Sequence, residues 1–199
     1  HGMTLGELAL MINGEGWLPD SRKCDLAVIK CKNYTHQTRY QLPIPPSPNL
    51  PNMKSIYLYP STCFFEATPV SLGRGTSLPF QVYGHPNMTG YNYSFTPRSI
   101  PGAKNPPQLN KLCYGVDLSN MSDEEIWKRG IDLTYVIDAY RNLNLDDHFF
   151  RPFFELLVGR DYVRKMIKEG KSADEIKAMW KGDVEKFKTQ RKPYLLYEE

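Results

Sequence analysis

Glu66 is the one carboxylate between Asp25 and Asp117, and its surroundings suggest acid–base chemistry. It lies in the run Tyr59–Thr68, which reads Y-P-S-T-C-F-F-E-A-T. Burial among such apolar side chains raises the pKa of an unpaired carboxyl, which suits a proton donor. A glutamate that accepts backbone hydrogen bonds or pairs with Arg74 would be structural instead. Hydrolysis of a glycosidic bond usually needs two carboxylates about 5–10 Å apart, so this region supplies one member of such a pair.

Arg74 is the second candidate, because it lies between two glycines in the sequence G-R-G-T. Glycine reaches backbone conformations that are closed to other residues and lets an anion approach closely. The guanidinium of Arg74 could then bind a carboxylate through two parallel hydrogen bonds. The same four residues are also compatible with a tight turn that carries a solvated arginine.

Several histidines and aromatic residues are weaker candidates. Residues 33–36 follow a predicted strand, and strand ends often border ligand sites. His36 and His85 are either proton shuttles or, more commonly, structural hydrogen-bonding groups. Aromatic residues either stack on sugar rings or fill the core, and both interpretations remain open for Tyr83, Tyr91, Tyr93 and Phe95.

Three capping boxes predict where helices begin. Each has a Thr or Ser followed three residues later by Glu, at Thr4, Ser122 and Ser172, a spacing that satisfies the first free N–H groups of a helix. The first helix is expected to stop at Gly14. The second is expected to run to about Asn144.

Strands are predicted at residues 25–32, 55–59 and 194–197, from their β-branched and aromatic content. Five prolines favour an extended path over residues 42–51. Because 14 of the 16 prolines precede residue 120, we expect a mixed α+β fold. It would be a single domain over residues 1–199, with a strand- and loop-rich part at 1–120 and a helical part at 121–199.

The composition and charge of the chain limit the classes of partner that it is expected to bind. The 199 residues are 41% hydrophobic and 13% aromatic, which is typical of a globular protein. The net charge of +3 contains no long run of one sign, so neither nucleic acid nor membrane insertion is expected. The four cysteines lack C-x-x-C spacing, which favours buried free thiols over a structural zinc site, with disulfides left as an alternative, and no metal is expected. The first residue is His1, and we interpret the start as a cut within a longer protein.

A series of short motifs, in order, resembles the exo-β-N-acetylmuramidase family. Near the ends they are H-G-M-T with G-E-L, from His1, and G-K-S-A, from Gly170. Between them are P-S-P-N-L-P, Y-P, E-A-T, G-R-G-T, P-F and G-H-P, which begin at positions 46, 59, 66, 73, 79 and 84. The resemblance covers essentially the whole chain.

The resemblance implies a two-domain enzyme that needs no cofactor. A Rossmann-like N-terminal domain, outside this chain, would carry the main catalytic glutamate, and this chain would be the C-terminal domain on one side of the cleft. The implied reaction releases N-acetylmuramic acid from the non-reducing end of cell-wall fragments. The implied partners are a glycan containing N-acetylmuramic acid and the protein's own N-terminal domain, in a secreted or periplasmic location.

Within that family, our first hypothesis is that this domain binds and orients substrate, with Arg74 reaching the lactyl carboxylate of muramic acid. Nearby hydrogen bonds would come from Asn49, Glu66, Thr76 and His85, with Glu66 the best local catalytic candidate. The chain departs from the family pattern at Ala67, Pro69 and Leu72, where relatives have a glycine, an asparagine and an acid. Two alternatives stay open: a domain that covers the catalytic domain without touching substrate, and a chain that hydrolyses sugars by itself.

Overall fold

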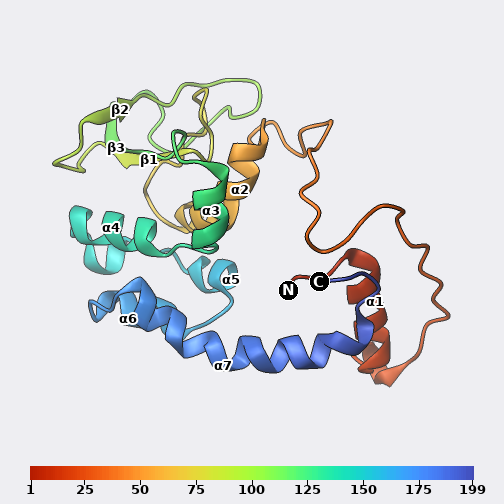
Figure 1. The fold of residues 1–199 in the computed structure, drawn as a ribbon. Helices are drawn as coiled ribbons and strands as arrows, with labels where there is room; N and C mark the ends of the chain where they lie inside the picture. Colours follow the sequence, from red (N-terminus) through yellow and green to blue (C-terminus); the bar gives the residue numbers. More distant parts are fainter. The chain divides into compact units, whose positions relative to one another are not determined.

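The computed structural model describes residues 1–199, which form two compact units (Figure 1). Unit 1 combines residues 1–41 with residues 178–199, and unit 2 comprises residues 42–177. The mixed α+β class is confirmed. The α-helices are α1 (Leu5–Gly14), α2 (Met53–Thr62), α3 (Asp123–Arg129), α4 (Thr134–Leu143), α5 (Phe154–Val158), α6 (Tyr162–Lys168) and α7 (Ala173–Arg191). The strands are β1 (Val82–His85), β2 (Tyr93–Phe95) and β3 (Cys113–Asp117), and the 3-10 turns are η1 (Pro19–Ser21), η2 (Cys63–Ala67), η3 (Asp146–His148) and η4 (Lys192–Tyr194).

Unit 1 is built around α1, which begins with the predicted capping box. The Thr4 side chain accepts a hydrogen bond from the Glu7 N–H, and the Glu7 carboxylate accepts one from the Thr4 N–H. The helix ends at Gly14, as expected. Figure 1 shows the C-terminal end of the chain beside α1, where η4 packs against the helix. The two ends of the sequence therefore form one unit.

Unit 2 contains an antiparallel sheet in the order β1-β3-β2. Tyr83 pairs with Val116 across β1 and β3, and Ser94 pairs with Tyr114 across β2 and β3. At Gly115 the backbones of β1 and β3 approach so closely that a Cβ atom would overlap the Tyr83 carbonyl oxygen. The sheet buries the side chains of Val82, Phe95 and Cys113 in one apolar cluster.

The helices of unit 2 pack through aromatic side chains. Phe150 lies 4.8 Å from Phe149 and 4.5 Å from Phe154, measured between ring centroids. The helix α5 packs against η2, and the Arg151 N–H donates to the Ala67 carbonyl at 2.9 Å. This contact fixes the turn that carries Glu66.

Two of the three predicted strands are absent because a helix or a turn takes their place. Residues 55–59 belong to α2, where the Asn52 side chain accepts from the Ser55 N–H at 2.9 Å and so caps the first turn. The buried positions Ser55, Leu58 and Thr62 follow helical spacing. Residues 194–197 begin in the turn η4, and the Leu196 N–H donates to the carboxylate of Glu7 instead of a neighbouring strand.

The third predicted strand, residues 25–32, has no regular secondary structure over residues 25–31, enters a turn at Lys32 and pairs with no other strand in this chain. The prediction of a strand there is wrong for this chain, because a β-ladder needs a partner backbone.

The helix expected from Ser122 to Asn144 is broken into α3 and α4. Gly130 takes φ +60° and its N–H donates to the Ile126 carbonyl at 3.1 Å, which closes α3. Asp132 then accepts from the Thr134 N–H at 2.8 Å and stabilises the start of α4. The expected end is confirmed, since Asn144 takes the left-handed conformation directly after α4. The helix predicted from Ser172 is confirmed as α7.

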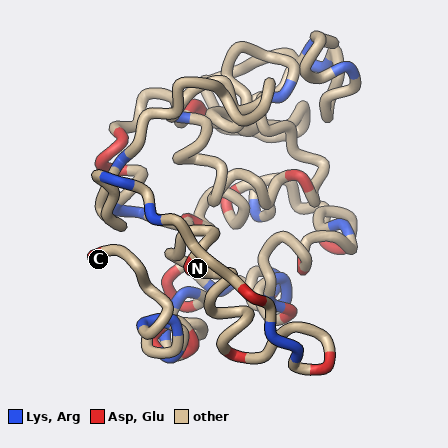
Figure 2. Tube along the Cα trace, turned by 90° about the vertical axis from the view of Figure 1, so that its right-hand side faces the viewer, with Lys and Arg blue, Asp and Glu red and all other residues tan.

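The chain has neither a long run of charge of one sign nor a long apolar helix. Figure 2 shows basic and acidic positions distributed along the trace. No helix combines the length and the apolar content that crossing a bilayer would require. All four cysteines are free thiols, of which only Cys113 is buried, so the expectation of free thiols is confirmed and that of general burial is not.

Candidate functional site

Glu66 lies on η2, directly after α2. Its neighbours Phe64, Phe65 and Ala67 point into the core of unit 2, and the glutamate side chain stays 27% exposed. Burial of these apolar side chains holds the turn in place, while the carboxyl of Glu66 remains partly exposed.

Arg74 lies on a turn that only glycine can form. Gly73 and Gly75 have φ of +81° and +83°, and a Cβ atom on either would overlap a backbone oxygen, that of Leu78 or that of Arg98. The Thr76 hydroxyl donates to the Gly73 carbonyl at 2.7 Å and closes the turn.

Glu66 and Arg74 are brought together, which is the arrangement that the structural interpretation of Glu66 predicted. Arg74 Nη1 lies 3.9 Å from Glu66 Oε1, which is an ion pair but longer than a hydrogen bond. Burial raises the pKa of the Glu66 carboxyl, while the positive charge of Arg74 opposes that rise. The pair thus joins a carboxyl that binds its proton more tightly than usual to a nearby fixed cation.

The guanidinium of Arg74 has hydrogen-bonding capacity that this chain does not use. Its Nε atom is buried and has no hydrogen-bond partner. Buried polar groups are nearly always paired, so an unpaired one indicates a ligand, a water molecule or stored strain. A planar carboxylate is the group that guanidinium geometry fits best.

Tyr59 and Cys63 are neighbours of Glu66 that the sequence interpretation missed. Burial and the charge of Glu66 raise the pKa of Tyr59, and the same two causes raise the pKa of the Cys63 thiol to about 11. Tyr59 is partly exposed, and its ring lies 5.1 Å from that of Phe80. Helical spacing places residues 59 and 63 on one face, but the predicted strand over residues 55–59 concealed that relationship.

Three other predicted site residues are engaged within the fold. The Asn49 side chain donates to the Gly102 carbonyl at 3.0 Å, and the Thr76 hydroxyl closes its own turn. His85, on β1, accepts from the Asn87 N–H at 3.1 Å through Nδ1, and burial together with the charge of Lys111 lowers its pKa. None of the three is hydrogen-bonded to Glu66 or Arg74.

The aromatic candidates are packed into the sheet region. The hydroxyls of Tyr83 and Tyr91 both donate to Asp138 Oδ2, at 2.9 and 2.7 Å, and Phe95 belongs to the buried cluster. Tyr93 lies 5.9 Å from Phe95, measured between ring centroids. Of the two interpretations left open for these residues, these contacts favour the structural one.

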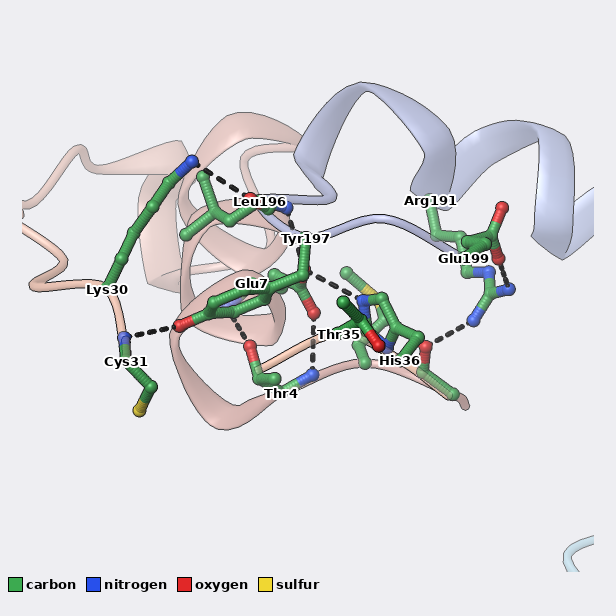
Figure 3. A network of polar contacts seen from close by, with 12 residues as sticks. Thr4, Glu7, Lys30, Cys31, Thr35, His36, Arg191, Leu196, Tyr197 and Glu199 are labelled. Carbon is green, nitrogen blue, oxygen red and sulfur yellow. Dashed lines mark hydrogen bonds and ion pairs between the residues drawn. The ribbon is translucent and has the colours of Figure 1, made fainter. Parts of the chain in front are cut away.

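A second polar cluster, in unit 1, surrounds the fully buried carboxylate of Glu7 (Figure 3). Oε1 accepts from the Leu196 N–H at 2.7 Å and contacts His36 Nε2 at 3.0 Å, and Oε2 accepts from the Thr4 N–H at 2.7 Å. Burial alone would raise the pKa of Glu7, but these hydrogen bonds outweigh it and lower the pKa to about 2. His36 therefore helps to hold the two chain ends together, which is a structural role.

The stretch of sequence that contains Glu66 and Arg74 carries more basic than acidic side chains, although Lys54 is paired with Asp123 of α3. Residues 42–116 contain five basic side chains, Lys54, Arg74, Arg98, Lys104 and Lys111, and one acidic side chain, Glu66. No group of three or more His, Cys, Asp or Glu side chains is arranged to hold a metal ion. The region therefore suits an anionic organic ligand better than a cation.

Comparison with known proteins places this chain in a family. The family model for the C-terminal part of exo-β-N-acetylmuramidase NamZ matches residues 57–197, and the model for its N-terminal part matches residues 1–54. The peptidoglycan β-N-acetylmuramidase NamZ of Bacillus subtilis (strain 168) is 33% identical over 216 residues, covering 99% of this chain and 50% of that protein.

Two crystal structures of DUF1343 family proteins from Bacteroides fragilis NCTC 9343 share the fold. One is 82% identical with a TM-score of 0.98, and covers 100% of this chain and 56% of that protein. The other is 24% identical with a TM-score of 0.73, and covers 98% of this chain and 56% of that protein. The chain thus spans about half the length of these relatives. Because the C-terminal family model alone matches more than two thirds of its residues, the chain belongs to the exo-β-N-acetylmuramidase NamZ family.

Proposed function

We propose that this chain supplies a substrate-binding surface of an exo-acting β-N-acetylmuramidase, and that Arg74 binds the lactyl carboxylate of N-acetylmuramic acid. The enzyme would release that sugar from the non-reducing end of peptidoglycan fragments, outside the cytoplasm. The observation that carries the proposal is the half-buried guanidinium of Arg74, whose buried Nε has no partner. The lactyl ether, which carries the carboxylate, is the one substituent that distinguishes muramic acid from glucosamine, and arginine is the side chain best suited to bind that carboxylate.

Glu66 would assist by donating a hydrogen bond or a proton at the same surface, since its raised pKa favours the protonated form. The only charge that acts on its pKa is that of Arg74. A glycosidase needs a second carboxylate within about 10 Å. We therefore propose that the main catalytic glutamate lies in the family's N-terminal region, outside this chain.

The test compares two substrates in a protein that joins this chain to the remainder of the 82% identical relative. In Arg74→Ala, kcat/KM for a chromogenic β-N-acetylmuraminide should fall about 10–100-fold, the loss expected for a charge-assisted hydrogen bond. The corresponding glucosaminide, which lacks the carboxylate, should be hydrolysed at a nearly unchanged rate. Arg74→Lys should restore only part of the activity, because lysine cannot form the two parallel bonds.

The matched control is Lys104→Ala, which removes an exposed cation of the same region and should change neither substrate. Equal losses on both substrates in Arg74→Ala would contradict the proposal. Unchanged kinetics with a lower melting temperature would favour the alternative, a domain that covers or assembles with the catalytic domain.

A further inference from the structure

Residues 25–32, which read D-L-A-V-I-K-C-K, form a segment of unit 1 that belongs to no helix or strand and ends in a turn at Lys32. We call them the open segment. Between Leu26 and Ile29, no backbone N–H or C=O makes a hydrogen bond within the chain. Backbone groups in folded proteins are nearly always paired with protein or with water. Four consecutive apolar residues, of which Val28 and Ile29 are β-branched, thus leave their backbone hydrogen-bonding groups available.

The two ends of the open segment are nevertheless held in place. Just before it, Cys24 is bound through both its N–H and its carbonyl by the Asn13 side chain, at 2.8 and 3.0 Å. Near its other end, the Cys31 N–H donates to the Tyr197 hydroxyl at 2.9 Å and Lys30 Nζ donates to the Leu196 carbonyl at 2.8 Å (Figure 3). These contacts preorganise an extended conformation, which lowers the entropy cost of pairing with another strand.

Both faces of the open segment are apolar. Leu26 and Val28 are half-buried, and Val28 lies against α1 at Gly6, where a Cβ atom would come within 2.6 Å of Val28 Cγ1. Ala27 and Ile29 point the other way, and Ile29 is 93% exposed. Apolar side chains on both faces are typical of a strand inside a sheet that is covered on both sides. An exposed strand of this kind would otherwise invite aggregation.

We propose that the open segment is a β-strand of a larger sheet, whose other strands come from the part of the family's N-terminal region that lies outside this chain. The family model for that region matches residues 1–54 and so includes the open segment, and the relatives are about twice as long as this chain. The helix α1 then covers one face of the sheet through Val28, and Ile29 is buried on the other face. Unit 1 is the docking surface for this one partner.

Amide hydrogen exchange provides the direct test, because it does not depend on activity. We compare the 199-residue chain with the same chain joined to the remainder of the 82% identical Bacteroides fragilis relative. In the isolated chain, amides 26–29 should exchange rapidly. In the joined protein their exchange should slow by at least about 100-fold, as for a sheet-paired amide. Equal exchange in the two proteins would overturn the proposal.

A pair of substitutions gives an independent test. Ile29→Asp should leave the melting temperature of the isolated chain unchanged and lower that of the joined protein by several degrees, because only there is the side chain buried. Leu156→Asp is the matched control, since Leu156 is 81% exposed in unit 2, and it should change neither. Equal effects of Ile29→Asp in both proteins would contradict the proposal. Protection of amides 26–29 that appears in the isolated chain with rising concentration would also contradict it, because the partner would then be a second copy.

Discussion

Glu7 in unit 1 is fully buried and Glu66 in unit 2 is partly exposed, and the pKa values of the two carboxyls shift in opposite directions. Glu7 accepts hydrogen bonds from two backbone N–H groups and contacts His36, and its pKa falls to about 2. Glu66 has a single distant cation, Arg74, and its pKa is raised. Both carboxylate oxygens of Glu7 accept hydrogen bonds within the fold. Glu66 and Arg74, in contrast, are too far apart for a hydrogen bond, and Arg74 Nε has no partner. The contrast suggests that unit 1 uses its carboxylate for assembly and unit 2 uses its pair for binding.

Removal of the Glu7 carboxylate should give the largest effect. Glu7→Ala removes a fully buried carboxylate and leaves the partly buried N–H groups of Thr4 and Leu196 without acceptors, so the free energy of unfolding should fall by about 3–5 kcal/mol. Urea denaturation measures this loss. Glu15→Ala, which removes an exposed carboxylate from the end of the same unit, should cost much less. Equal losses would mean that the buried network is not what holds the chain ends together.

Acidification should act on unit 1 in the same way. The folded pKa of Glu7 is about 2 against an ordinary value of 4.5, so its contribution is fully present above about pH 4.5. It is lost as the pH falls from 4.5 towards 2. Unfolding followed as a function of pH should show this decline, and Glu7→Ala should remove it. A wild-type stability that does not change over that range would refute the assignment.

Two glycines allow the cost of a positive φ to be measured separately from the cost of a steric overlap with a neighbouring backbone oxygen. Gly75 and Gly90 both have φ +83°, but a Cβ atom at 75 would overlap the Arg98 carbonyl oxygen whereas nothing lies within 4 Å at 90. Gly90→Ala should therefore cost about 1 kcal/mol. Gly75→Ala should cost about 2–3 kcal/mol because packing strain is added. Equal costs in thermal unfolding would show that the turn can relax.

Glu66→Gln should have the smallest effect on stability. A carboxyl with a raised folded pKa stabilises fully only below its unfolded pKa, and that contribution is lost as the pH rises through the folded pKa. At pH 7 the ionised form is disfavoured by burial, so Glu66→Gln should change the unfolding free energy by less than about 1 kcal/mol. Its effect on hydrolysis by the joined protein should be larger. A strong loss of stability at neutral pH would indicate a structural ion pair.

Sequence motifs predicted secondary structure correctly where the stabilising hydrogen bonds join residues close together in the sequence. The capping boxes at Thr4, Ser122 and Ser172 each begin a helix, because the hydrogen bonds that they make lie within four residues. Strand prediction failed because a strand depends on a partner that can be distant in the sequence. Residues 55–59 have β-forming side chains but become helical through the Asn52 cap and tertiary burial.

The candidate site was predictable only where its residues lie close together in the sequence. The G-R-G-T turn and the pairing of Glu66 with Arg74 follow from residues eight positions apart. The roles of Asn49 and His36 depend on contacts with Gly102 and with α1, which composition and spacing do not reveal. The neighbourhood of Tyr59 was missed because it depends on α2 being a helix.

The most direct test of the proposed division of labour is hydrolysis of a chromogenic β-N-acetylmuraminide. The 199-residue chain alone is compared with the same chain joined to the remainder of the Bacteroides fragilis relative, at equal concentration. We expect release of the chromophore only by the joined protein, because the main catalytic glutamate is proposed to lie outside this chain. Release by the isolated chain, abolished in Glu66→Gln, would contradict that proposal and make Glu66 the catalytic group.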